Sequence, residues 1–205
     1  MEINKLRTLQ LDALKEAANT GAAHAATALS ELIGQKVMIK VPVVEINTGH
    51  RTLNVVAQSN ETITGVVNKF MGDITGLTVW LLPENNARDL YDLCLQHMPE
   101  DRRSLATKRG SLMKEVAKYL TEAYLNTLGN MLGMVIVPKV PVLVNGEASD
   151  VVDIVLFEYG LENNFVVCIE NEFEFASKTL PMKGMFLMLP DFDSLKKILE
   201  TFNLE

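Results

Sequence analysis

A pattern that repeats along the chain is the feature that most constrains its fold. Apolar or small residues recur at helical spacing between about Thr8 and Ile33, and the same series returns 99 residues later. The two series are Leu14, Ala18, Gly21, Ala25, Ala28, Leu32 and Met113, Ala117, Leu120, Tyr124, Thr127, Met131. Spacings of four and three place each series on one helix face. Because Gly34 and Gly133 follow them, the sequence predicts two equivalent helices that each end at a glycine.

The repeat continues into predicted strands and a second pair of helices. Pro42 and Pro141, again 99 residues apart, lie in valine-rich segments typical of strands, and proline favours an edge strand because it lacks an N–H donor. Leu-Pro followed by an acidic residue occurs at Pro83 and Pro190, an offset of 107. The second half therefore holds about eight additional residues. Proline just inside a helix start, with a carboxylate in the first turn, predicts a helix after each motif.

Each half is thus predicted to contain a helix, about three strands and a second helix. We expect an α+β fold in which this unit is internally duplicated with pseudo-twofold symmetry, and in which helices cover a shared sheet of antiparallel type. The chain is predicted to be a single domain, 1–205, made of two repeats at about 1–100 and 101–205. The polar stretch at 98–104 is the predicted junction.

Composition excludes several classes of function. The 19 Lys and Arg against 26 Asp and Glu give a net charge of −7, and no basic cluster is interleaved with aromatic residues. We therefore expect no nucleic-acid partner. The N-terminus lacks the apolar core of a signal peptide, and the longest apolar run, Met131 to Pro138, is far shorter than the roughly 18 residues that span a bilayer. A cytoplasmic protein without membrane insertion is predicted, with Cys94 and Cys168 as buried reduced thiols.

Most catalytic motifs are absent from the sequence. It has no GxxxxGK, GxGxxG, HExxH or GxSxG, which excludes the enzyme classes that depend on them. The histidines, His24, His50 and His97, are scattered, and Cys94 with His97 would supply only two of the four ligands of a structural zinc. No metal site is expected.

One polar group on the first predicted helix is the candidate site. Asp12, Glu16 and Asn19 are four and three residues apart, so their side chains share a face, away from the apolar series. Spacing alone favours a solvated helix face with no special role, because acidic residues are common on exposed helix faces.

These residues carry a resemblance to a known family. The segment LDALKEAANTGAAHAATALSELIGQKVMIKVPVVEI resembles the CheC family of chemotaxis phosphatases, whose motif is Asp or Ser, three residues, Glu, two residues, Asn, then 22 residues and Pro. Asp12, Glu16, Asn19 and Pro42 meet every term. The second copy supplies Ser111, Glu115 and Pro141 at matching spacing, with Lys118 where the family has Asn. Two further segments, MGDITGLTVWLLP and GMFLMLPDFDSLKKIL, are also similar, so the resemblance extends over nearly the whole chain.

The resemblance implies a function. Members of this family, which includes proteins of the CheC, CheX and FliY types, remove the phosphoryl group from the aspartate of phosphorylated CheY. It implies Glu16, Asn19 and Glu115 as catalytic residues, and Asp12 and Ser111 as substrate-binding residues. No cofactor of the chain's own is implied, because Mg²⁺ is expected on the phosphorylated response regulator. Some members also bind CheD, the receptor deamidase, so CheD is a candidate partner.

The sequence leaves two questions open: whether the chain is a phosphatase, and whether its second motif is active. The alternative to a phosphatase is a non-catalytic chemotaxis or flagellar-switch binding module, for example an adaptor for CheD. A scaffold without a signalling role is a third interpretation. Lys118 predicts a degenerate second site, since an ammonium cannot accept a hydrogen bond from water and is expected to pair with Glu115 at i, i+3. The competing hypothesis is that Lys118 donates to a phosphate oxygen and the site still works.

Overall fold

The computed structural model of the protein describes residues 8–48, 61–106, 108–159, 165–176 and 181–202. The first half comprises α1 (Thr8–Ile33), β1 (Val37–Thr48), β2 (Thr62–Gly72), β3 (Gly76–Pro83) and α3 (Glu84–His97). A short 3-10 helix, η2 (Glu100–Ala106), leads to the second half. That half comprises α4 (Arg109–Leu132), β4 (Ile136–Pro138), β5 (Val142–Glu147), α5 (Ala148–Tyr159), β6 (Phe165–Phe175), β7 (Met182–Pro190) and α6 (Phe192–Thr201).

The described strands form one sheet that interleaves the two halves. Its order is β1-β6-β7-β3-β2-β4, with β5 also paired to β2, and every described pairing is antiparallel. The first strand of one half pairs with the second strand of the other: β1 runs beside β6, while β4 and β5 run beside β2. Exchanging the halves leaves this order unchanged, as an internal duplication requires. The sheet therefore depends on both halves of the chain.

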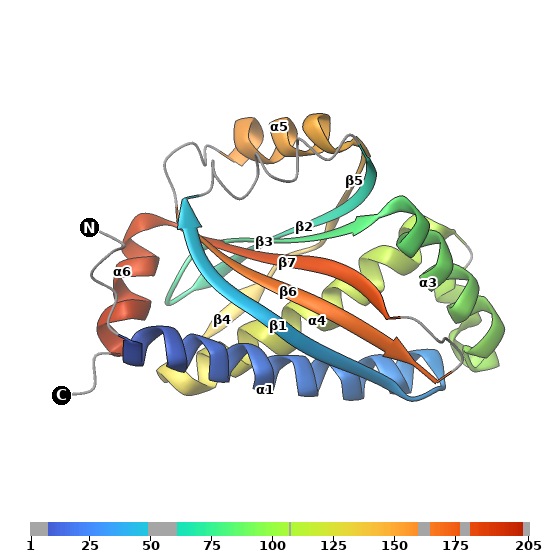
Figure 1. The fold of residues 1–205 in the computed structure, drawn as a ribbon, viewed down its shortest axis with the longest axis horizontal. Helices are drawn as coiled ribbons and strands as arrows, with labels where there is room; N and C mark the ends of the chain where they lie inside the picture. Colours follow the sequence, from blue (N-terminus) through green and yellow to red (C-terminus); the bar gives the residue numbers. More distant parts are fainter. Residues whose placement is uncertain (1–7, 49–60, 107, 160–164, 177–180, 203–205) are drawn as a thin grey trace.

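Helices cover both faces of the sheet (Figure 1). α1 and α4 lie along one face, and α5 lies across the other, with α3 and α6 near opposite ends. The larger buried cluster joins α1 and α4 to side chains such as Trp80 and Phe186. A smaller cluster places Val151, Val152 and Val155 of α5 against β2, β3 and β7. Alternating side chains along each strand supply the two clusters, because successive residues point to opposite faces.

α1 and α4 approach each other closely at a glycine. A Cβ on Gly21 would lie 2.6 Å from Cδ1 of Tyr124 and 3.2 Å from its Cα. His24 Nδ1 and Thr127 Oγ1 are 3.1 Å apart across the same contact. The Tyr124 ring stacks on Phe186, with centroids 4.6 Å apart, and its hydroxyl donates to Asn171 Oδ1 at 2.5 Å. Because α1 and α4 are locked together, the motif-bearing helices are held rigidly on the sheet.

The predicted helices and their glycine ends are confirmed. Gly34 and Gly133 have φ of 78° and 65°, the left-handed conformation that glycine adopts without steric cost. The apolar series are buried with two exceptions: Ala28 is half-buried and Met131 is 39% exposed. Met131 lies in the last turn of α4 on the side that faces away from the core, whereas its neighbour Leu132 is buried.

The prolines also behave largely as predicted. β1 and β4 are the outer strands of the sheet, so Pro42 in β1 and Pro141, between β4 and β5, lie at its edges. The valine-rich segment around Pro141 is, however, two short strands and not one. Pro83 and Pro190 precede their helices instead of lying inside them: Pro83 is the N-cap of α3, and Asp191 is the N-cap of α6.

The helix α5 was not predicted. The offset of 99 aligns α5 with residues 49–60 of the first half. Those residues lie outside the described part of the chain. The apolar residues of α5, such as Val151, Val152 and Val155, follow helical spacing but are β-branched, so the local composition favours a strand. Burial against the sheet overrides that propensity.

Candidate functional site

The first motif forms an exposed row on α1. Asp12, Glu16 and Asn19 are all exposed, while Leu14, Ala18 and their successors on the opposite side are buried. The predicted shared face is therefore confirmed. Within the described part of the chain, none of the three side chains has a hydrogen bond or ion pair. Two carboxylates and one amide thus face outward and are available to another molecule.

The second motif is arranged differently on α4. Ser111 is exposed, whereas Glu115 and Lys118 are half-buried. Lys118 Nζ lies 3.4 Å from Glu115 Oε1 and 5.7 Å from the centroid of the Tyr119 ring. The predicted i, i+3 ion pair is present, and the Glu115 carboxylate raises the pKa of the Lys118 ammonium above its usual value. Glu115 is consequently occupied by a residue of its own helix.

The second motif also lines a hollow of about 580 Å³. Its walls come from η2, from α4, from Pro138 at the end of β4 and from the β4–β5 connection, which includes Pro141. Charged side chains around it are Lys114, Glu115, Lys118, Glu122 and Lys139. The hollow therefore carries three ammonium groups and two carboxylates. The row on α1 has the opposite balance of charge, because its two carboxylates outnumber the one neighbouring ammonium group, that of Lys15.

A pair of lysines at the repeat offset reinforces this difference. Lys40 and Lys139 are 99 residues apart. Lys40 Nζ is 2.5 Å from Glu174 Oε1, which raises its pKa. Lys139 has no such carboxylate among the described residues, and its backbone is fixed by Lys69 O at 2.7 Å and by the Asn68 side-chain amide at 3.1 Å. The ammonium of Lys139 is therefore free for a ligand, whereas that of Lys40 is neutralised.

Sequence reasoning identified Lys118 but missed the other two lysines of this hollow, Lys114 and Lys139. Lys114 and Lys139 each have a lysine at the equivalent first-half position, Lys15 and Lys40. The same offset that revealed the motifs would have revealed these pairs. The offset would not have shown that Glu174 pairs with Lys40, because the contact between these two residues joins β1 and β6, which are distant in sequence.

The remaining site predictions concern thiols and metals. Cys94 and Cys168 are buried free thiols, and burial raises the pKa of each to about 12. Across the described ranges, no three His, Cys, Asp or Glu side chains converge as a metal site would require. His97 is exposed while Cys94 is buried, and His50 lies outside the described residues. Among the helices that the structure describes, none has the length and apolar character to cross a membrane.

Comparisons with known proteins agree with these features. The family described as CheC-like matches residues 9–46, the segment that carries the first motif. The CheY-P phosphatase CheC of Bacillus subtilis (strain 168) is 24% identical over 202 residues, covering 95% of this chain and 94% of the relative. The crystal structure of Thermotoga maritima FliY superposes with a TM-score of 0.74 at 20% identity, covering 97% and 98% of the two chains.

Another structure of similar fold is a complex of two proteins. It is the CheX–CheY–BeF₃–Mg²⁺ complex from Borrelia burgdorferi, with a TM-score of 0.52, 11% identity, and coverage of 86% of this chain and 97% of the other. These similarities confirm the predicted fold class, and they confirm the resemblance that the motif indicated.

Proposed function

We propose that this chain, whose resemblance to the CheC family now extends over 95% of its length, hydrolyses the aspartyl phosphate of the response regulator CheY. The observation that carries the proposal is the exposed row of Asp12, Glu16 and Asn19 on α1, without partners among the described residues. A relative of matching length is a CheY-P phosphatase, and a protein of similar fold has been crystallised with CheY, BeF₃ and Mg²⁺. Both support CheY as the substrate.

We assign to Asn19 the role of positioning the attacking water. Its amide offers a carbonyl oxygen that accepts a hydrogen bond from water and an NH₂ that donates to a neighbouring oxygen. In-line phosphoryl transfer depends mainly on positioning and electrostatic stabilisation. The Mg²⁺ and lysine expected on the regulator would neutralise the phosphoryl oxygens, so the phosphatase needs to add only an oriented water. A helix that packs closely against α4 at Gly21 suits that task.

Glu16 is assigned the docking contact, with Asp12 assisting recognition. Glu16 is one helical turn from Asn19, so a bond from its carboxylate to the regulator's active-site lysine would fix the register of Asn19 over the phosphate. Asp12 adds a second carboxylate to the same row, and the two negative charges together attract a cationic group such as the regulator's lysine. Both side chains are exposed, as encounter with a partner requires.

The second motif is assigned little or no activity. Glu115 is paired with Lys118, and the surrounding lysines, Lys114 and Lys139, would repel the regulator's lysine. The first helix should therefore carry nearly all turnover.

A phosphorylated-regulator decay assay tests the proposal. Wild-type protein should accelerate the loss of the phosphoryl group from the CheY of the same organism, and Asn19→Ala should lose about 10²-fold or more of that acceleration. Binding of BeF₃-activated CheY should change little, because the amide acts on water. Asn126→Ala is the matched control, an exposed asparagine on α4 without an assigned role. Wild-type turnover by Asn19→Ala would refute the assignment.

The alternative function is a binding module of the flagellar-switch type. Two observations support a binding module: the superposition on FliY and the absence of the asparagine from the second motif, where Lys118 stands. An adaptor would bind the regulator or CheD without accelerating phosphate loss. Gel filtration with the CheD of the same organism, followed by the decay assay on the complex, separates the two. Faster decay in the complex supports a phosphatase stimulated by CheD, whereas co-elution without any hydrolysis supports an adaptor.

A further inference from the structure

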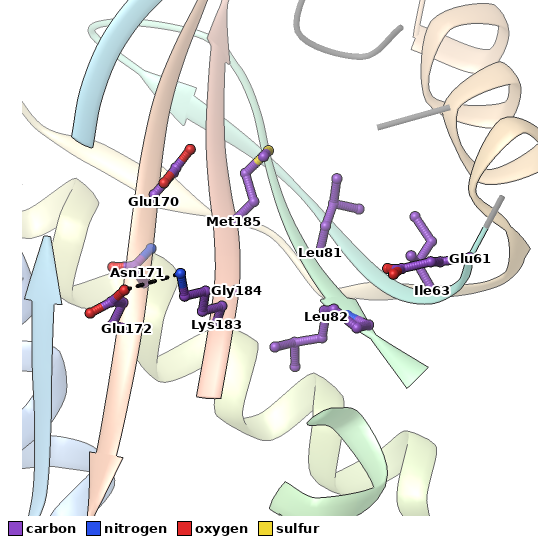
Figure 2. A pocket seen from close by; sticks show the side chains of 11 residues that line it. Glu61, Ile63, Leu81, Leu82, Glu170, Asn171, Glu172, Lys183, Gly184 and Met185 are labelled. Carbon is purple, nitrogen blue, oxygen red and sulfur yellow. Dashed lines mark ion pairs between the residues drawn. The ribbon is translucent and has the colours of Figure 1, made fainter. Parts of the chain in front are cut away.

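A second hollow opens in the middle of the sheet, where β3 and β7 separate. Their described pairing runs from Gly76↔Pro190 to Leu81↔Met185, and both strands extend beyond that last pair. The space between them has a volume of about 320 Å³, and its apolar walls are Ile63, Leu81, Leu82 and Met185 (Figure 2). This volume is near the lower end of the roughly 300–1,000 Å³ typical of ligand sites.

The rim of this hollow is acidic. Glu61, Glu170 and Glu172 line it, and Lys183 is the one cation among the described residues of its lining. Lys183 Nζ lies 3.5 Å from Glu172 Oε1, so its charge is already matched (Figure 2). Glu170 is exposed and has no ion pair within the described ranges. The field of a chain with net charge −7 acts in the same direction, so cations are attracted to this opening.

We infer that the hollow between β3 and β7 binds an organic cation with an apolar body. The apolar part fills the space between Leu81, Leu82 and Met185, and a protonated amine or guanidinium pairs with Glu170 at the rim. An apolar anion would meet the same walls but would be repelled by the carboxylates. The same chemistry is presented by a free amine and by a lysine or arginine beside an apolar side chain in a partner protein. This inference does not depend on the proposed phosphatase function.

The chain carries a built-in reporter for this site. Trp80 is its only tryptophan and is 2% exposed. Its Nε1 lies 3.2 Å from the point where a Cβ on Gly184 would sit, and Gly184 lines the hollow. Nε1 has no hydrogen-bond partner among the described residues. Because a ligand in the hollow would change the surroundings of the indole, the intrinsic fluorescence should follow its occupancy.

A three-ligand titration tests the inference. At pH 7, 2-phenylethylamine is a cation, 2-phenylethanol is neutral and phenylacetate is an anion, with nearly the same apolar body. The amine should bind about two- to fivefold more tightly than the alcohol, the range for an exposed ion pair, and the acid should bind most weakly. A second arm uses N-acetyl-phenylalanyl-lysine amide. Tighter binding of this peptide identifies a partner segment as the occupant, and preference for 2-phenylethylamine identifies a free ligand.

Two variants test whether Glu170 is the source of the preference for the amine. Glu170→Gln should remove the preference for the amine over the alcohol and leave the affinity for the alcohol unchanged. Glu31→Gln, an exposed glutamate on α1, should leave both unchanged. Equal affinities for all three ligands, the absence of a saturable fluorescence change, or an unaltered preference in Glu170→Gln would overturn the inference. None of these outcomes depends on phosphatase activity.

Discussion

The unequal motifs lead to a specific prediction about restoring activity. Asn19→Ala should remove the water-positioning amide and leave almost no hydrolysis, because Lys118 blocks the second motif. Adding Lys118→Asn to Asn19→Ala should then restore measurable turnover from α4. The substitution supplies an amide at the position equivalent to Asn19, and it releases Glu115 from its contact at 3.4 Å.

The structure sets the expected magnitudes. A loss of 10²-fold corresponds to about 2.7 kcal/mol of transition-state stabilisation. Restoration should be partial, because Lys114 and Lys139 still oppose the regulator's lysine. The Lys118–Glu115 pair is 44% and 24% exposed, and such a helix pair contributes about 0.2–0.5 kcal/mol at most. Thermal stability should therefore hardly change, and recovered activity would not reflect altered folding.

The assay compares the decay of phosphorylated CheY for the wild type, Asn19→Ala and the double variant. Lys114→Asn on the Asn19→Ala background is the matched control, since it removes one positive charge from the same hollow without completing the motif. If Asn19→Ala alone keeps about half of the activity, the second motif is active with Lys118 in place. If Lys114→Asn restores turnover as well as Lys118→Asn does, charge and not the amide is decisive. Either result would refute the reasoning.

Three further predictions follow from other parts of the structure. Glu16→Lys should weaken capture of CheY at low salt, because it reverses a charge that steers encounter; an unchanged affinity would contradict its docking role. Gly21→Ala should lower the free energy of unfolding by about 1–3 kcal/mol, since a Cβ 3.2 Å from the Tyr124 backbone overpacks the contact between α1 and α4; urea denaturation measures this. Cys94 and Cys168, with pKa values raised to about 12, should resist iodoacetamide at pH 8 until the protein unfolds.

Each of these has a control. Glu31→Lys makes the same charge reversal on α1 outside the motif and should not affect capture of CheY. Thr20→Ala, at the exposed neighbour of Gly21, should leave the free energy of unfolding unchanged or slightly higher, because alanine is the better helix former. A Gly21→Ala protein as stable as the wild type would show that the two helices can move apart at little cost. Rapid alkylation of the native thiols would show that their burial is transient.

Much of the fold was predictable because local signals and the repeat agree. The apolar series from Leu14 to Leu32 sets both the helix and its buried face, and Gly34 ends it at the predicted position. The proline positions identified the edges of the sheet. What the sequence could not provide was strand order. Pairing of β1 with β6 instead of β2 depends on contacts between distant residues, such as Val37 with Phe175, and local periodicity carries no information about them.

The candidate site was predictable to a similar degree. A spacing of four and three placed Asp12, Glu16 and Asn19 on one face, and the charge of Lys118 predicted its pairing with Glu115. The hollow beside α4 was not predictable, because it forms only when η2, β4 and the β4–β5 connection pack beside α4, and local spacing does not determine that packing. Helix α5 was also missed, since its β-branched residues favour strands unless a sheet face lies beneath them.

The interleaved sheet has a consequence for how the chain folds during synthesis. When the first half leaves the ribosome, β2 and β3 can pair at once, but β1 must wait for β6, which is made near the end. Until then both backbone edges of β1 are unpaired and open to other nascent chains, whereas in the folded sheet only its outer edge is. Pairings over such long separations are slow to form. Pro42 interrupts the ladder between Lys40 and Val43, which makes this waiting edge a poor template for a foreign strand.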